Sequence, residues 1–109
     1  MNKELIVFGR TYPCPDLMRT QRFLKANDIS YRQINIDEDE TALQIVERWV
    51  GHHSVPTVVV ARAGDVHPIV DPEPVPSGRS TRSYDRGSMI TEPSDDALRG
   101  FLRRHGLVS

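Results

Sequence analysis

Along the 109-residue chain, segments with the apolar spacing of strands take turns with segments that have the apolar spacing of helices. Residues 4–9 form a short, nearly continuous apolar run, which is typical of a strand buried on both faces of a sheet. Residues 31–36 alternate between polar and apolar positions, as a half-buried strand does. Residues 56–61 open with a proline and are dense in β-branched side chains, which favours a third strand. We expect a fourth strand at residues 88–91.

Three segments combine helical spacing of apolar residues with the signals that begin and end helices. The first covers residues 15–27 and has a proline in its first turn. The second covers residues 37–50, with Asp37 as its N-cap. The third covers residues 94–105, with Ser94 as its N-cap, acidic residues in the first turn and basic residues in the last. Strands separated by crossover helices predict one sheet with helices on its faces.

The segment of residues 62–86 fits neither pattern and holds four of the eight prolines. A structureless loop of this length is uncommon inside a compact domain and points to function or to disorder. We expect plain disorder or a surface flap, and a partner-docking arm is the functional alternative. If residues 85–88 form the return turn, the segment hangs from the far end of the sheet and does not line the site at Cys14. If residues 63–65 form the turn and 66–70 a strand, its proline-rich part lies beside Cys14 as a lid.

Composition and charge narrow the classes of function. The chain has 14 Lys and Arg residues against 15 Asp and Glu, with a formal net charge of -1 and 38% hydrophobic residues. Because the cations are scattered among the acids, we interpret them as a solvated surface and disfavour a nucleic-acid partner. The apolar run at residues 5–8 is too short for a signal peptide or a membrane span. We therefore expect no membrane partner and a cytoplasmic location.

The chain has one cysteine, Cys14, and it lies between Pro13 and Pro15 where the first strand gives way to the first helix. A lone cysteine cannot form an internal disulfide, which agrees with a reducing compartment. At the start of a helix, unpaired N–H groups and the positive end of the dipole stabilise the thiolate, which is the nucleophile. Asp16 opposes this effect if it points toward the sulfur, whereas Arg10 supports it. The alternative is a cysteine that packs as a small apolar residue.

Three segments together resemble the glutaredoxins, small members of the thioredoxin fold. They are I-V-F-G-R-T-Y-P-C-P-D-L at residues 6–17, S-V-P-T at residues 54–57 and T-E-P-S-D-D at residues 91–96. In that family they correspond to the active-site loop, a loop with a cis-proline and the start of the last helix. Residues 85–94 are similar to those of the bacterial mycoredoxins, which favours residues 85–88 as the return turn. Residues 62–86 have no counterpart in the family.

The resemblance implies the fold, which is an α/β class and a thioredoxin-like three-layer α/β/α sandwich. Its four-stranded mixed sheet and three helices follow the order β-α-β-α-β-(long loop)-β-α. We expect residues 1–109 to form a single glutaredoxin-like domain with an irregular insertion at about residues 62–86.

The resemblance also implies a nucleophile and a set of thiol- and peptide-binding residues. The peptide bond before Pro56 is expected to be cis, so that the preceding residue can pair with a bound thiol peptide as an added strand does. The free N–H groups at the start of the last helix form an anion site suited to a carboxylate, unless they only cap the helix. The nucleophile is Cys14, and the binding residues are Arg10, Tyr12, Val55, Pro56, Ser94 and Asp95.

Leu17 stands where dithiol glutaredoxins have a second cysteine, so this chain cannot resolve a mixed disulfide internally. A single thiol can still take a small thiol from a protein mixed disulfide and pass it to a second small thiol. The resemblance thus implies a monothiol oxidoreductase with glutathione or mycothiol as co-substrate, thiolated or disulfide-bonded proteins as substrates and no tightly bound cofactor. We expect a monomer. The alternatives are a redox-inert binding module that uses residues 62–86, or a dimer that binds an iron-sulfur cluster.

His52 and His53 precede the predicted cis-proline loop and raise the question of a metal site or a general acid. Adjacent histidines point apart in an extended chain, and a metal site needs more ligands than these. We interpret both as solvated loop residues.

Overall fold

The computed structural model describes residues 2–108, and its strands form one mixed four-stranded sheet with the order β2-β1-β3-β4. β1 pairs with β2 in parallel and with β3 antiparallel, and β3 pairs antiparallel with β4. This topology confirms the predicted thioredoxin-like sheet. The elements in chain order are β1 (Lys3–Gly9), α1 (Pro15–Ala26), β2 (Arg32–Asn35), α2 (Glu40–Val50), β3 (Thr57–Arg62), β4 (Met89–Thr91) and α3 (Asp95–Arg104).

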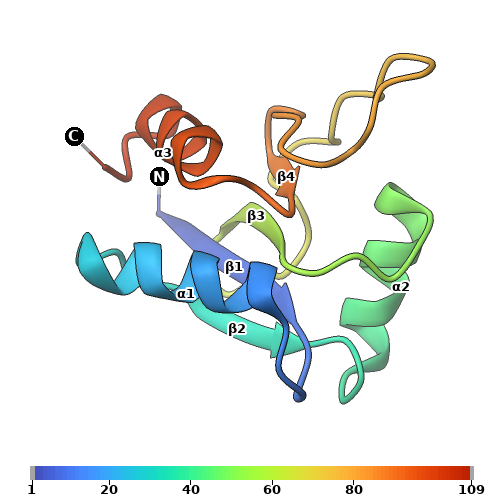
Figure 1. Ribbon diagram of the computed structural model, residues 1–109, viewed down its shortest axis with the longest axis horizontal. Helices are drawn as coiled ribbons and strands as arrows, with labels where there is room; N and C mark the ends of the chain where they lie inside the picture. Colours follow the sequence, from blue (N-terminus) through green and yellow to red (C-terminus); the bar gives the residue numbers. More distant parts are fainter. Residues whose placement is uncertain (1, 109) are drawn as a thin grey trace.

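The sheet is covered on both faces, as the apolar run in β1 predicts. Leu5 and Val7 belong to one buried cluster, which contains the apolar side chains of α1 and α3. Ile6 and Phe8 belong to a second cluster, which contains those of α2. Successive side chains of a strand point to opposite faces, so a central strand between two helical layers is apolar throughout. Figure 1 shows α1 and α3 lying together and α2 apart from them. The expected three-layer sandwich is confirmed.

The helices begin and end close to the predicted positions, with one correction. The predicted N-cap of the second helix, Asp37, is wrong, because the N-cap is Asp39, whose side chain accepts a hydrogen bond from Ala42 N at 2.9 Å. Asp37 instead accepts hydrogen bonds from the backbone N and the hydroxyl of Thr11, and so ties the loop after β1 to the loop after β2. Ser94 caps α3 as predicted. No helix within residues 2–108 is both long enough and apolar enough to cross a membrane.

The connection between β3 and β4, which we call the excursion (residues 63–88), is packed against the fold at both ends. Near its start, Ile69 N donates to Val60 O at 2.9 Å, and near its end the Ser88 hydroxyl donates to Val70 O at 2.6 Å. Residues 63–65 and 73–80 are mostly exposed, and the second of these parts projects from the molecule in Figure 1. Plain disorder is therefore wrong for the ends of the excursion, whereas residues 73–80 lie at the surface as a flap does.

The excursion also returns to the end of the sheet that carries Cys14. β4 begins at Met89, which agrees with the prediction that residues 85–88 form the return turn. The conclusion drawn from that turn, that the excursion stays away from the site, is wrong. Ser83 N donates to Thr91 O at 2.8 Å, and the Arg82 side chain reaches Asp16 in the first turn of α1. The chain leaves at the far end of β3 but runs back beside β4 before its final turn.

Candidate active site

Cys14 is the N-cap residue of α1. Its backbone is extended, with φ -147 and ψ 120, and Pro15 begins the helix. The Cys14 carbonyl accepts the first intrahelical hydrogen bond from Met18 N at 2.9 Å, while the side chain makes no capping bond. The residue is half-buried. A sulfur in this position lies at the positive end of the α1 dipole and remains open to a reaction partner.

The loop before β3 lies opposite the sulfur. Cys14 Sγ is 3.8 Å from Val55 O, which is hydrogen-bond range for a thiol donor. The Val55–Pro56 peptide bond is cis. Pro56 O accepts from Glu92 N at 2.7 Å, and the Thr57 hydroxyl donates to Ser54 O at 2.9 Å, so both sides of this loop are anchored. The structure thus brings Val55 to Cys14 from 41 residues away along the chain, with Pro56 next to it.

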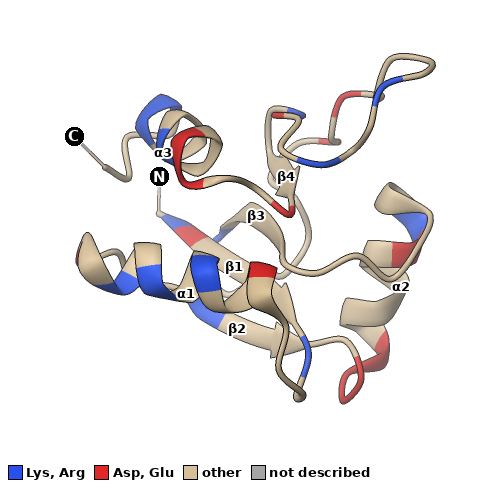
Figure 2. Cartoon of the chain, in the orientation of Figure 1, with Lys and Arg blue, Asp and Glu red and all other residues tan. Residues whose placement is uncertain are grey.

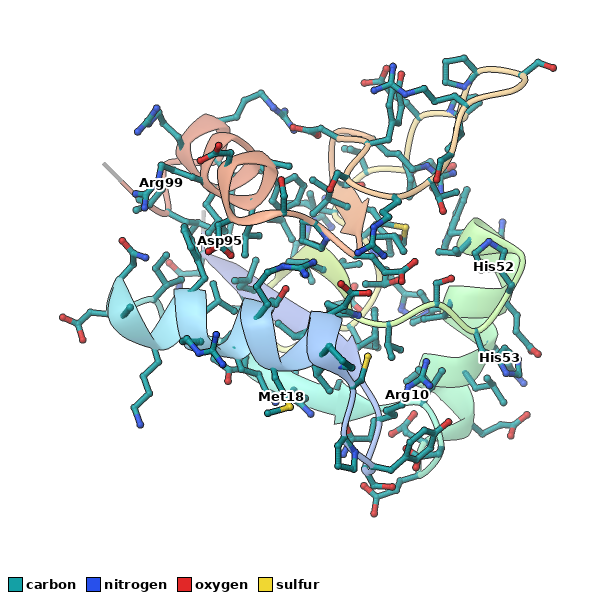
Figure 3. All side chains as sticks on the ribbon, in the orientation of Figure 1. Arg10, Met18, His52, His53, Asp95 and Arg99 are labelled. Atoms are coloured by element: carbon teal, nitrogen blue, oxygen red, sulfur yellow. The ribbon has the colours of Figure 1, made fainter. Side chains whose placement is uncertain are left out.

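Arg10 and Tyr12 belong to the loop after β1 that also carries Cys14, and they interact with each other. Arg10 Nη1 donates to the Tyr12 hydroxyl at 3.2 Å and Nη2 donates to His53 O at 3.1 Å, and the guanidinium lies 5.0 Å from the centre of the Tyr12 ring. Figure 3 shows Arg10 at the loop after β1, close to His53. Both residues line a hollow of about 460 Å³ that also contains Cys14, Gln21 and Gln33. Arg10 is therefore positioned to contact a ligand of this hollow.

Asp16, two residues after Cys14, is bound by two arginines. Arg82 Nη2 donates to Asp16 Oδ1 at 2.8 Å and Arg82 Nη1 donates to Oδ2 at 3.0 Å, while Arg19 Nη2 lies 2.8 Å from Oδ1. The hydrogen bonds from Arg82, followed by those from Arg19, lower the pKa of Asp16 to about 2. The i, i+3 spacing could have indicated the Arg19 contact. No sequence signal indicates Arg82, which comes from the excursion 66 residues away.

Replacing Asp16 with asparagine is expected to destabilise the fold by about 1 to 2 kcal/mol at pH 7, a value reduced for the half-exposed Arg82 partner. Because the pKa of folded Asp16 lies below its unfolded value of about 3.9, the ion pairs stabilise the protein above about pH 4. That stabilisation is lost as pH falls through about 2. Urea unfolding of wild type and Asp16→Asn from pH 7 to pH 2 measures the difference.

The exposed acid Asp71 provides the matched control, and Asp71→Asn should leave the free energy of unfolding within about 0.5 kcal/mol of wild type. If the free energies of unfolding of wild type and Asp16→Asn differed by the same amount over the whole pH range, the ion-pair explanation would be contradicted.

The start of α3 differs from the expected free anion site. Ser94 N donates to the Ser83 hydroxyl at 2.9 Å, and the Ser94 hydroxyl accepts from Ala97 N at 3.2 Å. The prediction of a free N–H group at Ser94 is therefore wrong, because the excursion supplies an acceptor for it. Asp95 occupies the first turn of α3 with an exposed side chain, and Figure 3 shows it on the side of α3 that faces α1.

The two histidines make contacts within their own region of the chain. His53 Nε2 lies 2.8 Å from Glu47 Oε2, and His52 Nδ1 forms a hydrogen bond with the Ser54 hydroxyl. The His53 contact with a carboxylate was not anticipated from the sequence. Within residues 2–108, no group of three or more His, Cys, Asp or Glu residues is arranged to hold a metal ion.

A family model described as glutaredoxin matches residues 5–64, which is more than half of the chain. The matched span runs from β1 to just past β3 and contains both Cys14 and the Val55–Pro56 loop. Searches among curated proteins and among solved structures give no match. The family match agrees with a half-buried cysteine at the start of α1 opposite that loop, and the chain belongs to the glutaredoxin family of thiol–disulfide oxidoreductases.

Proposed function

We propose that this protein is a monothiol oxidoreductase that removes a low-molecular-weight thiol from protein mixed disulfides through Cys14. The observation that carries the proposal is the half-buried Cys14 at the N-cap of α1, with its sulfur 3.8 Å from Val55 O. Leu17 is buried one turn into α1, so the position that a second cysteine would take holds an apolar side chain instead. The reaction therefore needs a second small thiol for its completion.

The chemistry consists of two exchanges. The Cys14 thiolate attacks the sulfur of the small thiol in the mixed disulfide, so a disulfide forms between Cys14 and the small thiol while the protein sulfur leaves as a thiolate and takes a proton. A second small thiol, as its thiolate, then attacks the small-thiol sulfur of that adduct. This step releases a disulfide of two small thiols and restores the Cys14 thiolate. Overall one disulfide replaces another: the protein sulfur is reduced to a thiol, and the second small thiol is oxidised into the released disulfide.

The surroundings of the sulfur suggest roles for the residues around it. The backbone at Val55 and Pro56 provides an edge along which the extended backbone of a thiol peptide could pair, as an added strand does. The 3.8 Å separation between Val55 O and Cys14 Sγ supports this role. The hollow beside Arg10 and Tyr12 provides a second place for the small thiol or for the target chain. Glutathione and mycothiol are the co-substrates that we propose, and we propose that the monomer works in a reducing compartment such as the cytoplasm.

Steady-state assays with peptide mixed disulfides of glutathione and of mycothiol test the proposal. We expect turnover in the presence of the matching free thiol, with the parallel-line kinetics of a two-step exchange through a covalent intermediate. No rate above the uncatalysed exchange with either thiol would contradict the proposal and would favour a redox-inert binding module. Visible absorbance after anaerobic purification would instead indicate a bound iron-sulfur cluster.

A further inference from the structure

Two residues of the excursion lie between the Cys14 site and the start of α3. Arg82 forms an isolated parallel bridge with Thr91, the last residue of β4, and the next residue, Ser83, donates its N–H to Thr91 O at 2.8 Å. This backbone pairing places both side chains beside the entry to α3. We call the group of side chains gathered here the α3 side of the site, and it consists of Asp16, Arg19, Arg82, Ser83, Glu92, Ser94, Asp95 and Asp96.

The N–H groups that would bind an anion at the start of α3 are partly occupied. The first four N–H groups of a helix have no intrahelical partner and are the ones that attract anions. In α3 the Ser83 hydroxyl accepts from Ser94 N at 2.9 Å, and the Ser94 hydroxyl accepts from Ala97 N at 3.2 Å. The two positions between them are Asp95 and Asp96, whose side chains are themselves carboxylates. A ligand carboxylate thus meets fewer donors here than at an uncapped helix.

The cations of the α3 side are engaged by acids of the protein. Arg82 bonds both oxygens of Asp16, and its Nη1 also donates to Glu92 Oε2 at 3.0 Å. Arg19 contacts Asp16 and donates to Pro93 O at 3.0 Å. The four carboxylates of the α3 side therefore exceed its two guanidinium groups by two negative charges. Figure 2 shows acidic positions at the start of α3, at the end of β4 and in the first turn of α1.

The hollow beside Cys14 is lined by uncharged polar groups as well as by the cation Arg10. In the hollow beside Cys14, Gln21 Nε2 donates to Gln33 Oε1 at 2.6 Å, and Gln33 Nε2 donates to Asn35 Oδ1 at 2.8 Å. Side-chain amides have both donors and acceptors and so suit ligand hydroxyl and amide groups.

We propose that the α3 side is closed to carboxylates, because its acids outnumber its cations and Ser83 occupies Ser94 N, so that the co-substrate is a thiol whose polar groups there are uncharged hydroxyls or amides. Arg82 limits the surplus of negative charge by pairing with Asp16 and Glu92. This inference rests on the proposed function, because it names the substrate class of the same site. Arg82 and Ser83 act through different contacts, and their replacements are therefore expected to have opposite effects. Ser83→Ala frees Ser94 N for an anion. Arg82→Gln leaves Asp16 and Glu92 without a shared counter-ion.

The test measures how fast Cys14 is modified by two methanethiosulfonate reagents of similar size, one with a sulfonate and one with a trimethylammonium group. Intact mass gives both rates, and their ratio, anionic over cationic, reports the charge around the sulfur without requiring catalysis. We expect Arg82→Gln to lower this ratio about 3- to 10-fold and Ser83→Ala to raise it about 2- to 5-fold. Arg79→Gln, which removes an exposed cation of the same excursion, should leave the ratio within about twofold of wild type.

The double variant Asp16→Asn/Arg82→Gln separates charge from loosening of the excursion. It lacks the same contact as Arg82→Gln but regains the net charge of wild type, so the ratio should return toward the wild-type value. A ratio that stays low in the double variant, or an Arg82→Gln ratio equal to that of wild type, would overturn the electrostatic role. A fall in the ratio for Ser83→Ala would overturn the role of Ser83.

Turnover then identifies the thiol class. We compare the rate enhancement over the uncatalysed exchange for two peptide mixed disulfides, one of uncharged 2-mercaptoethanol and one of glutathione. Wild type should give the larger enhancement with the 2-mercaptoethanol disulfide, and Ser83→Ala should reduce the difference between the two enhancements. Faster reduction of the glutathione disulfide by wild type would overturn the inference while leaving the proposed function intact. Turnover of neither of these disulfides, nor of the mycothiol disulfide, would end the proposed function, and the reagent ratios alone would then decide whether Arg82 and Ser83 control access of anions to the sulfur.

Discussion

Replacing Cys14 with serine is expected to reduce the rate of mixed-disulfide exchange to that of the uncatalysed reaction. Cys14 provides the sulfur that the proposed reaction needs, and it is the one cysteine of the chain. A serine hydroxyl cannot form a disulfide, so no intermediate forms and no part of the catalysed rate remains. The measurement is the initial rate of release of a peptide thiol from its mixed disulfide, with equal concentrations of wild type and Cys14→Ser.

Two controls distinguish loss of the nucleophile from loss of the fold. Wild type blocked with iodoacetamide should be as inactive as Cys14→Ser, because both lack a free sulfur. Cys14→Ser should retain a free energy of unfolding within about 1 kcal/mol of wild type, since sulfur and oxygen differ little in size. Exchange activity that survives in Cys14→Ser would contradict the assignment of the nucleophile.

Replacing Arg86 with methionine is expected to lower the free energy of unfolding by about 2 to 4 kcal/mol. Arg86 is buried, with 6% of its surface exposed. Its Nη1 donates to Trp49 O in the last turn of α2 at 2.5 Å, and its Nε donates to Glu73 O in the excursion at 2.7 Å. Burial lowers the pKa of the Arg86 guanidinium by desolvation. This cost of desolvation offsets part of the stability that the two hydrogen bonds contribute. Methionine fills a similar space but leaves both carbonyls without their donor, and urea unfolding measures the loss.

Arg79→Met is the matched control, because Arg79 lies in the exposed part of the same excursion and contacts the Tyr84 ring at 4.7 Å. We expect a change of no more than about 1 kcal/mol for this variant. Equal destabilisation by the two substitutions would indicate that Arg86 does not join the excursion to α2 in the way the contacts suggest.

The sequence predicts the fold well because its signals are local. The apolar run of β1, the capping residue Ser94 and Gly51, the C-cap of α2, each act within a few residues of their position. The error at Asp37 has a local cause as well. Both Asp37 and Asp39 are residues that cap helices, and the contact that commits Asp37 elsewhere comes from Thr11, 26 residues away. Spacing along the chain cannot distinguish the two.

The site could be predicted only where its residues lie in the three segments that resemble the glutaredoxins. Cys14 and the Val55–Pro56 loop are recognisable from short motifs, and they lie opposite each other. The occupied α3 side could not be predicted, because Arg82 and Ser83 belong to a proline-rich segment with no regular period and no family counterpart. Their contacts with Asp16 and Ser94 depend on the path of the excursion before its return turn, and no local pattern in the segment specifies that path.

The central claim is that Cys14 takes the small thiol, and not the target chain, from a mixed disulfide. The most direct measurement mixes wild type with a peptide disulfide of 2-mercaptoethanol in the absence of free thiol, quenches with acid at short times and records intact mass. The account predicts a 2-mercaptoethanol adduct on Cys14 that grows at the same rate as the free peptide thiol. Release of the peptide without that adduct, or an adduct that carries the peptide instead, would contradict it.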